Sequence, residues 1–276
     1  MKDFQTLLYE LHSKPHLILP HYATALGNRL EKYLAGDMPL PCFEEDTQDN
    51  QEQPENNDGI EVIDITGVIC KRLGLPEEIT NFFGMCDLDH VDEDIREAMS
   101  DANIKCVILN VNSPGGFLSG VQTTANLISE LSKLKETVVY SDVLNCSAAY
   151  WLSSKANTII TTADCEVGSI GVYTELIEHS KQLELEGIKA TLIKAGKYKG
   201  IGCSTQPLTD EQKAYIQDDV NKTWNTFKSA VNEKRTIADD DMQGQCFTGE
   251  DLINKGFVDG FANDISEVRE TLLAKE

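Results

Sequence analysis

The stretch IKCVILNVNSPGG, residues 104–116, joins a continuous apolar run to a turn that contains two glycines. An apolar run of this length is typical of a strand that is buried on both faces of a parallel sheet. Two adjacent glycines let the backbone turn sharply at the end of such a strand. The next residues, 117–135, repeat apolar side chains at helical spacing. The stretch therefore predicts a central strand, a tight turn and a helix that packs back on the sheet.

Strand and helix patterns alternate on both sides of this stretch. Strand-like runs occur at residues 59–69, 137–143, 158–162 and 187–195. Helical patterns occur at residues 92–102, 147–156, 175–186, 209–235 and 266–276. Alternation of this kind predicts an α/β domain with a mainly parallel sheet and right-handed crossovers.

The residues before this domain differ in composition. Residues 4–14 (FQTLLYELHSK) have a helical pattern, and residues 15–36 end in one, with Gly36 as a helix stop. Residues 44–58 contain seven acidic residues and no Lys or Arg, a composition that cannot bury enough apolar surface to become ordered. We therefore predict an N-terminal helical extension over residues 1–43, an acidic flexible linker over residues 44–58 and a main domain over residues 59–276.

The charge and hydropathy of the chain exclude several classes of protein. The formal net charge of −22 argues against nucleic-acid binding, because contacts to phosphate groups need clustered Lys and Arg side chains. No run of 18 apolar residues occurs, so no membrane span is predicted. The first twenty residues lack the basic start and continuous apolar segment of a signal peptide. These features predict a cytoplasmic protein.

Neither a metal nor a cofactor is predicted. The eight cysteines are scattered without a C-x-x-C pair, and we expect them to be reduced and mostly buried. His90 has acidic neighbours, but their spacing matches no standard ligand pattern, and capping of the following helix accounts for them. The sequence GSIGVY, residues 168–173, lacks the glycine spacing of a dinucleotide fingerprint.

Three segments that follow predicted strands could carry chemistry. The glycines of NSPGG, residues 112–116, could present backbone N–H groups as an oxyanion hole, or could form only a tight turn. Ser147 opens a predicted helix, where a serine is either a nucleophile or an N-cap. The lysines of KAGKYKG, residues 194–200, could include a base for serine, since burial lowers the pKa of a lysine amine, or could form a solvated loop.

Two other candidates for the base are less suitable. Lys155 follows Ser147 by eight residues on the same short helix, which places it about two turns away. His179 lies in a helical pattern, where an exposed histidine is the simpler interpretation.

Five motifs occur in the order and rough spacing of the signal peptide peptidase A family of serine peptidases, which the sequence from residue 60 onward resembles. These motifs are NSPGG, CSAAYWLSSKANTIITT, VGSIGVY, GKYKG and FTGEDLINKGFVD. The resemblance implies the Clp protease/crotonase-like α/β fold. It also implies a serine endopeptidase that needs no cofactor and assembles as a homo-oligomer.

The resemblance assigns a role to single positions. Ser147 matches the nucleophile of a Ser-Lys dyad, and Lys199 matches its general base. Gly116 matches an oxyanion-hole donor, and the N–H of Ala148 is the expected second donor. Ser169 matches a serine that orients the lysine amine.

Within this family, the sequences SAAYW and ELHSKPHLILPHYATAL are similar to the phage head-maturation branch. That branch implies scaffold and capsid proteins as substrates. The alternatives are a cellular peptidase of the signal-peptide-peptidase type, a crotonase-like acyl-CoA enzyme, and an inactive scaffold or assembly protein with the same fold.

Overall fold

Residues 106–112 of the stretch form an interior strand of the main sheet, and residues 115–116 begin a strand of a smaller sheet. The computed structural model describes residues 15–39 and 58–274. Its main sheet has five strands in the order β12-β9-β7-β5-β2, and every pairing is parallel. These strands are β2 (Ile60–Thr66), β5 (Cys106–Asn112), β7 (Glu136–Ser141), β9 (Thr158–Thr161) and β12 (Gly260–Phe261). The predicted α/β class with a mainly parallel sheet is thereby confirmed.

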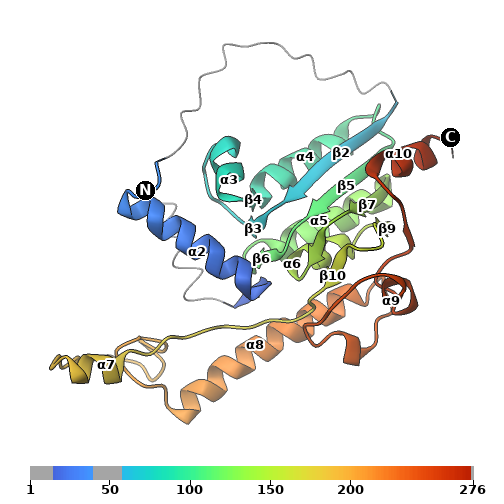
Figure 1. Ribbon diagram of the computed structural model, residues 1–276. Helices are drawn as coiled ribbons and strands as arrows, with labels where there is room; N and C mark the ends of the chain where they lie inside the picture. The colour runs from blue at the N-terminus through green and yellow to red at the C-terminus, as the bar shows by residue number, and fades with distance from the viewer. Residues whose placement is uncertain (1–14, 40–57, 275–276) are drawn as a thin grey trace.

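Helices cover both faces of this sheet (Figure 1). Alternate residues of β5 point to opposite faces, as a strand requires. Val107, Leu109 and Val111 pack with α4 (Leu88–Ser100), α5 (Val121–Leu134) and α6 (Ala148–Ser153). On the other face, Ile108 packs with α10 (Ile265–Leu273). The continuous apolar run of β5 is thus explained by burial on both sides.

Two small sheets continue the main strands beyond kinks near their carboxyl ends. One has the order β1-β6-β3-β4, and the other has the order β11-β10-β8. The first contains β1 (His16–Ile18), β3 (Val68–Cys70), β4 (Met85–Asp87) and β6 (Gly115–Phe117), and the second contains β8 (Leu144–Cys146), β10 (Glu166–Gly168) and β11 (Cys246–Phe247). This edge is where open α/β sheets place their functional sites.

The N-terminal segment packs on the first small sheet. α2 (Pro20–Ala35) ends at Gly36, which has φ +85°, as the sequence predicts. Leu26 and Leu30 of α2 share a core cluster with Phe83 of α3 (Glu77–Phe83). The predicted helix at residues 4–14 lies outside the described residues, as does the predicted linker at residues 44–58 except for Asp58.

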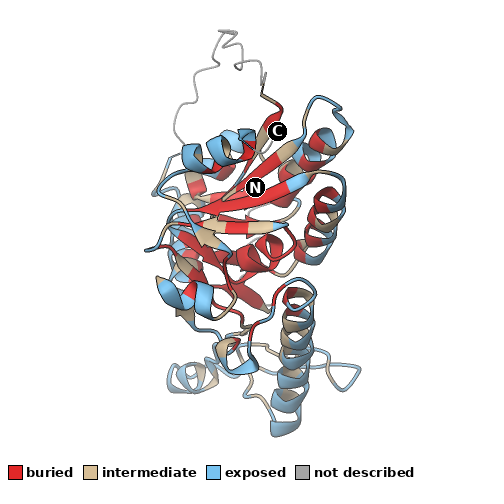
Figure 2. Cartoon of the chain, turned by 90° about the vertical axis from the view of Figure 1, so that its right-hand side faces the viewer, coloured by how far each residue is buried: buried red, intermediate tan, exposed pale blue. Residues whose placement is uncertain are grey.

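Residues 174–209 form an arm that projects from the body together with the start of α8 (Asp210–Val231) (Figure 1). Figure 2 shows that this part of the molecule is largely exposed. The arm contains α7 (Ser180–Leu185), which is shorter than the helix predicted over residues 175–186. α9 (Glu250–Asn254) and a short 3₁₀ helix (Asp239–Asp241) follow α8.

The predicted strand at residues 187–195 is wrong, because the structure has no strand there. A strand is stabilised by pairing with a neighbour, and this segment lies on the arm, away from the edges of the sheets. Conversely, the sequence does not predict β1, because its three residues are too few to show a periodicity. Among residues 15–39 and 58–274, none of the helices combines the length and the apolar character that a membrane span requires.

Trp151 joins α6 to α8, and replacing it is expected to destabilise the fold. Its indole is 1% exposed and stacks on Phe227, with ring centroids 4.8 Å apart and an interplanar angle of 9°. Trp151→Ala is expected to lower the free energy of unfolding by about 3–5 kcal/mol through the cavity that it leaves. Chemical denaturation followed by circular dichroism measures the change. Trp151→Phe, which keeps a stacked ring, should cost clearly less, and an equal cost would contradict this role of the ring.

Candidate active site

Ser147 stands at the junction of β8 and α6. It is 1% exposed, and its backbone N–H donates to the carbonyl of Gly168 at 2.8 Å. Among the described residues, no hydrogen bond joins its side chain to the first turn of α6. The N-cap interpretation of the hydroxyl therefore fails, although Ser147 does hold the N-cap position.

The backbone of Ser147 is strained. Its φ of 56° and ψ of −117° lie outside the regions that residues with a Cβ normally adopt. Such a conformation costs on the order of 1–3 kcal/mol and persists where the surrounding structure enforces it, often at functional sites. A sharp turn from a strand to a helix also serves to present a nucleophile at the carboxyl edge of a sheet.

The glycine turn lies directly against this serine. A Cβ built on Gly115 would lie 2.8 Å from Ser147 Cβ and 3.0 Å from Cys146 O. Gly115 has φ +96°, and its N–H donates to Ser113 Oγ at 3.2 Å. Gly116 follows in β6, where a Cβ would lie 2.0 Å from Ile69 O. The sequence did not single out Gly115, although its place in a strand-to-helix turn was a signal for it.

Ala148 and Ser169 also belong to this site. Ala148 is the first residue of α6 and is fully buried beside Ser147. The first N–H groups of a helix have no partner within the helix, so they are available to an oxyanion. Ser169 follows Gly168, whose neighbour in β8 is Cys146, so the two serines continue adjacent strands. Like Ser147, Ser169 is buried and has a positive φ, of 53°.

Lys199 lies on the projecting arm and is exposed. The neighbouring Tyr198 stacks on Tyr215 of α8, with ring centroids 4.4 Å apart, which holds this loop against the helix. Among the described residues, no hydrogen bond or ion pair joins Lys199 to Ser147. A single copy of the chain therefore brings together Ser147, Gly116, Ala148 and Ser169, but does not bring Lys199 to them.

Other amines in the body are engaged elsewhere. Lys155 is buried, and its Nζ lies 2.6 Å from both Glu233 Oε2 and Ala230 O. Burial and the nearby cations Arg235 and Lys155 hold the pKa of Lys234 below its usual value. However, the Lys234 amine donates to Ser132 Oγ at 2.7 Å. His179 is exposed at the start of α7, as predicted.

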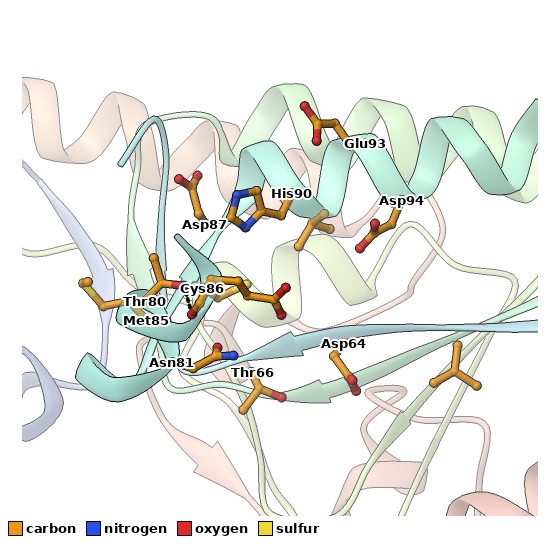
Figure 3. A pocket seen from close by; sticks show the side chains of 13 residues that line it. Asp64, Thr66, Thr80, Asn81, Met85, Cys86, Asp87, His90, Glu93 and Asp94 are labelled. Atoms are coloured by element: carbon orange, nitrogen blue, oxygen red, sulfur yellow. Dashed lines mark hydrogen bonds between the residues drawn. The ribbon is translucent and has the colours of Figure 1, made fainter. Parts of the chain in front are cut away.

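A separate acidic hollow of about 430 Å³ lies between β2, α3 and α4 (Figure 3). His90 lines it together with Asp64, Glu93 and Asp94. Burial, together with the negative charge of Glu97, raises the pKa of Asp94. Within residues 15–39 and 58–274, however, no three His, Cys, Asp or Glu side chains are grouped as metal ligands would be.

Replacing Gly115 by alanine is expected to disturb the site through a steric clash, in addition to the cost of placing alanine at a positive φ. The new Cβ would meet Leu17 O at 2.1 Å as well as Ser147, so the backbone must move. We expect Gly115→Ala to lower both the melting temperature and kcat/KM, the latter by about 10²-fold, since a small displacement of reacting groups costs that much.

Gly36→Ala is the matched control for Gly115→Ala, because Gly36 also has a positive φ but has open space around its Cβ. It carries the conformational cost without the clash. Equal losses of activity and stability in the two variants would contradict a close approach at Gly115.

Comparisons with known proteins identify the family of the chain. The sequence profile of Peptidase family S49 matches residues 129–273, which is more than half of the chain. A putative protease of Methanocaldococcus jannaschii is 40% identical over 167 residues, covering 58% of this chain and 52% of the relative. The capsid assembly protease C of Escherichia phage lambda is 25% identical over 224 residues, covering 79% of this chain and 50% of the relative.

Among solved structures, the 1510-N membrane protease specific for a stomatin homolog from Pyrococcus horikoshii aligns at 15% identity with a TM-score of 0.37, covering 77% of each chain. This chain spans about half the length of the two curated relatives. The α/β class with a mainly parallel sheet agrees with the fold that the resemblance to the signal peptide peptidase A family implies. The chain belongs to Peptidase family S49.

Proposed function

We propose that this protein is a serine endopeptidase in which Ser147 attacks the peptide bond. The observation that carries the proposal is the strained Ser147, whose hydroxyl is not used as a helix cap and which lies against a glycine turn and a helix N-terminus. A nucleophile with donors waiting beside it is the combination that acyl transfer requires.

In the proposed mechanism, the neutral amine of Lys199 accepts the Ser147 proton while Oγ bonds to the carbonyl carbon. The N–H groups of Gly116 and Ala148 stabilise the oxyanion, and Ser169 orients the amine. The protonated lysine then gives its proton to the leaving amine. Water hydrolyses the acyl-enzyme with the same lysine as base. Removal of an oxyanion donor typically costs 10²–10³ in rate.

We propose further that Lys199 serves Ser147 of a neighbouring copy. The arm that carries it projects from the body and is rich in exposed apolar side chains: Leu185 is 89% exposed and Ile193 is 92% exposed. Exposed apolar residues on a projecting element favour a contact with another protein surface. A copy that donates its arm to the next copy makes a heterologous contact, which can close into a ring.

The test of the peptidase function is cleavage of an unfolded protein by the purified chain, with the Ser147→Ala variant as control. Peptide products from the wild type and none from the variant are expected. Turnover of an acyl-CoA thioester without peptide cleavage would favour the crotonase-like alternative instead. Equal behaviour of the two proteins in both assays would favour an inactive assembly protein.

For the substrate, we propose scaffold or capsid proteins of a phage head. The similarity to a phage capsid assembly protease supports this choice. Co-expression with candidate scaffold and capsid proteins, comparing wild type with Ser147→Ala, tests it. Cleavage of these proteins only by the wild type is expected, and their survival alongside cleavage of other unfolded proteins would favour the cellular peptidase.

A further inference from the structure

The short strand β1 occupies the edge of β6 beside the nucleophile. It pairs with β6 in antiparallel register, with Leu17 opposite Gly116 and Ile18 opposite Gly115. On its other side, His16 exchanges backbone hydrogen bonds with Tyr173, with N–O distances of 2.8 and 3.3 Å. The strand is therefore held between two extended segments, as an added strand would be.

The backbone of β1 reaches the catalytic residues. A Cβ built on Gly115 would lie 2.1 Å from Leu17 O and 2.8 Å from Ser147 Cβ. Leu17 of β1 and Ser147 therefore both lie against Gly115. Farther along, the N–H of Leu19 donates to Pro114 O at 3.0 Å. The N-terminal segment thus runs alongside residues 114–117, next to Ser147.

Extended peptides are commonly recognised by pairing with an exposed strand edge, where backbone hydrogen bonds supply affinity and pockets read alternate side chains. The free edge beside Ser147 would be that of β6, and β1 covers it. The side chains of β1 are also deeply buried: His16 is 3%, Leu17 0% and Ile18 3% exposed. An incoming peptide cannot pair with β6 while β1 is present.

We infer that β1 is an internal pseudosubstrate: it fills the peptide-binding edge of β6, and an extended apolar segment of a substrate binds there only after β1 has left. This inference rests on the proposed function of Ser147. The chemistry of β1 defines the occupant of the groove, which is an uncharged extended strand with aliphatic side chains.

The tether makes β1 a strong competitor. A segment joined to its own binding site acts at an effective concentration on the order of millimolar. A free peptide therefore meets a groove that is almost always filled, and its apparent affinity falls in proportion to the open fraction. A substitution that weakens the pairing of β1 with β6 should therefore open the groove while Ser147 stays intact.

Binding of the free strand tests the inference without relying on catalysis. The probe is a fluorescently labelled peptide of residues 15–21, PHLILPH, and its binding is measured by fluorescence anisotropy. Two full-length variants release β1: Leu17→Asp places a charge in the buried strand, and His16→Pro removes the N–H that donates to Tyr173 O. We expect both variants to bind the peptide about 100-fold or more tightly than the wild type does. Leu134→Asp, at an exposed apolar position, is the matched control.

A disulfide lock gives the opposite change. His16 and Phe117 lie directly opposite each other. Because the Leu19–Pro114 pair is hydrogen-bonded and the two kinds of pair alternate, His16 and Phe117 form a non-hydrogen-bonded pair. The Cα separation of such a pair, about 4.5 Å, suits a disulfide. The double variant His16→Cys/Phe117→Cys, oxidised, is expected to bind no peptide and to lose peptidase activity. A reductant should restore both, and the two single variants are the controls.

Three results would overturn the inference. The first is an equal affinity of the peptide for the wild type and for a release variant that circular dichroism shows to be folded. The second is a locked chain that binds peptide or cleaves protein like the reduced one. The third is an N-terminal fragment ending between residues 16 and 19 that the wild type releases and Ser147→Ala does not, since β1 would then be a substrate. Failure of the proposed function would give a different result: the release and locked variants would change peptide binding as expected, but no form of the protein would cleave peptides.

Discussion

Replacing Ser147 by alanine is expected to abolish peptide cleavage while leaving the fold intact. The substitution removes only Oγ, and this atom makes no capping hydrogen bond in the described structure, so α6 should lose little stability. Removing the nucleophile of a serine peptidase lowers kcat by about 10⁴-fold or more. The measurement is the initial rate on an unfolded protein substrate, and circular dichroism and thermal melting establish that the variant is folded.

The matched control for Ser147→Ala is His179→Ala. His179 is exposed at the start of α7, so its loss should leave the rate nearly unchanged. Appreciable cleavage by purified Ser147→Ala would exclude Ser147 as the nucleophile. A dead His179→Ala variant would instead favour a base that is a histidine rather than a lysine.

Replacing Lys199 by alanine is expected to cause a loss of similar size, and the activity should return when two inactive variants are mixed. If the arm of one copy serves the next, a Ser147→Ala copy can supply Lys199 to a Lys199→Ala copy. Random mixing of equal amounts should restore about a quarter of the wild-type activity, since half of the intact serines meet an intact lysine. The mixture must first exchange subunits, which dilution and reassembly can achieve.

The mixing experiment separates two arrangements of the dyad. No recovery, in oligomers shown by size-exclusion chromatography to contain both variants, would mean that each copy uses its own lysine. Lys197→Ala is the control for the loop, because Lys197 pairs with Glu211 on the exposed surface and should be dispensable. Full activity of Lys199→Ala alone would exclude Lys199 as the base.

Local sequence patterns predicted most of the fold. The apolar run at residues 104–112 became the doubly buried β5, and residues 209–235 became α8. Gly36 ended α2, because a left-handed residue terminates a helix whatever packs around it. The failures include the strand expected at residues 187–195 and the unexpected strand β1 and helix α3. Whether an extended segment forms a strand depends on a partner, and residues far away in the chain supply that partner.

The features of the candidate site also fall into those that local sequence predicts and those that depend on distant residues. The sequence by itself determined the glycine turn at residues 112–116 and the serine at a strand-to-helix junction, because both are properties of a few adjacent residues. Only the tertiary structure decided that Gly115 touches Ser147, that Lys199 stands on a separate arm and that β1 lies along the edge of β6. These contacts join segments that are tens of residues apart. They are set by the packing of the sheets and by the direction of the arm, and no local pattern records either.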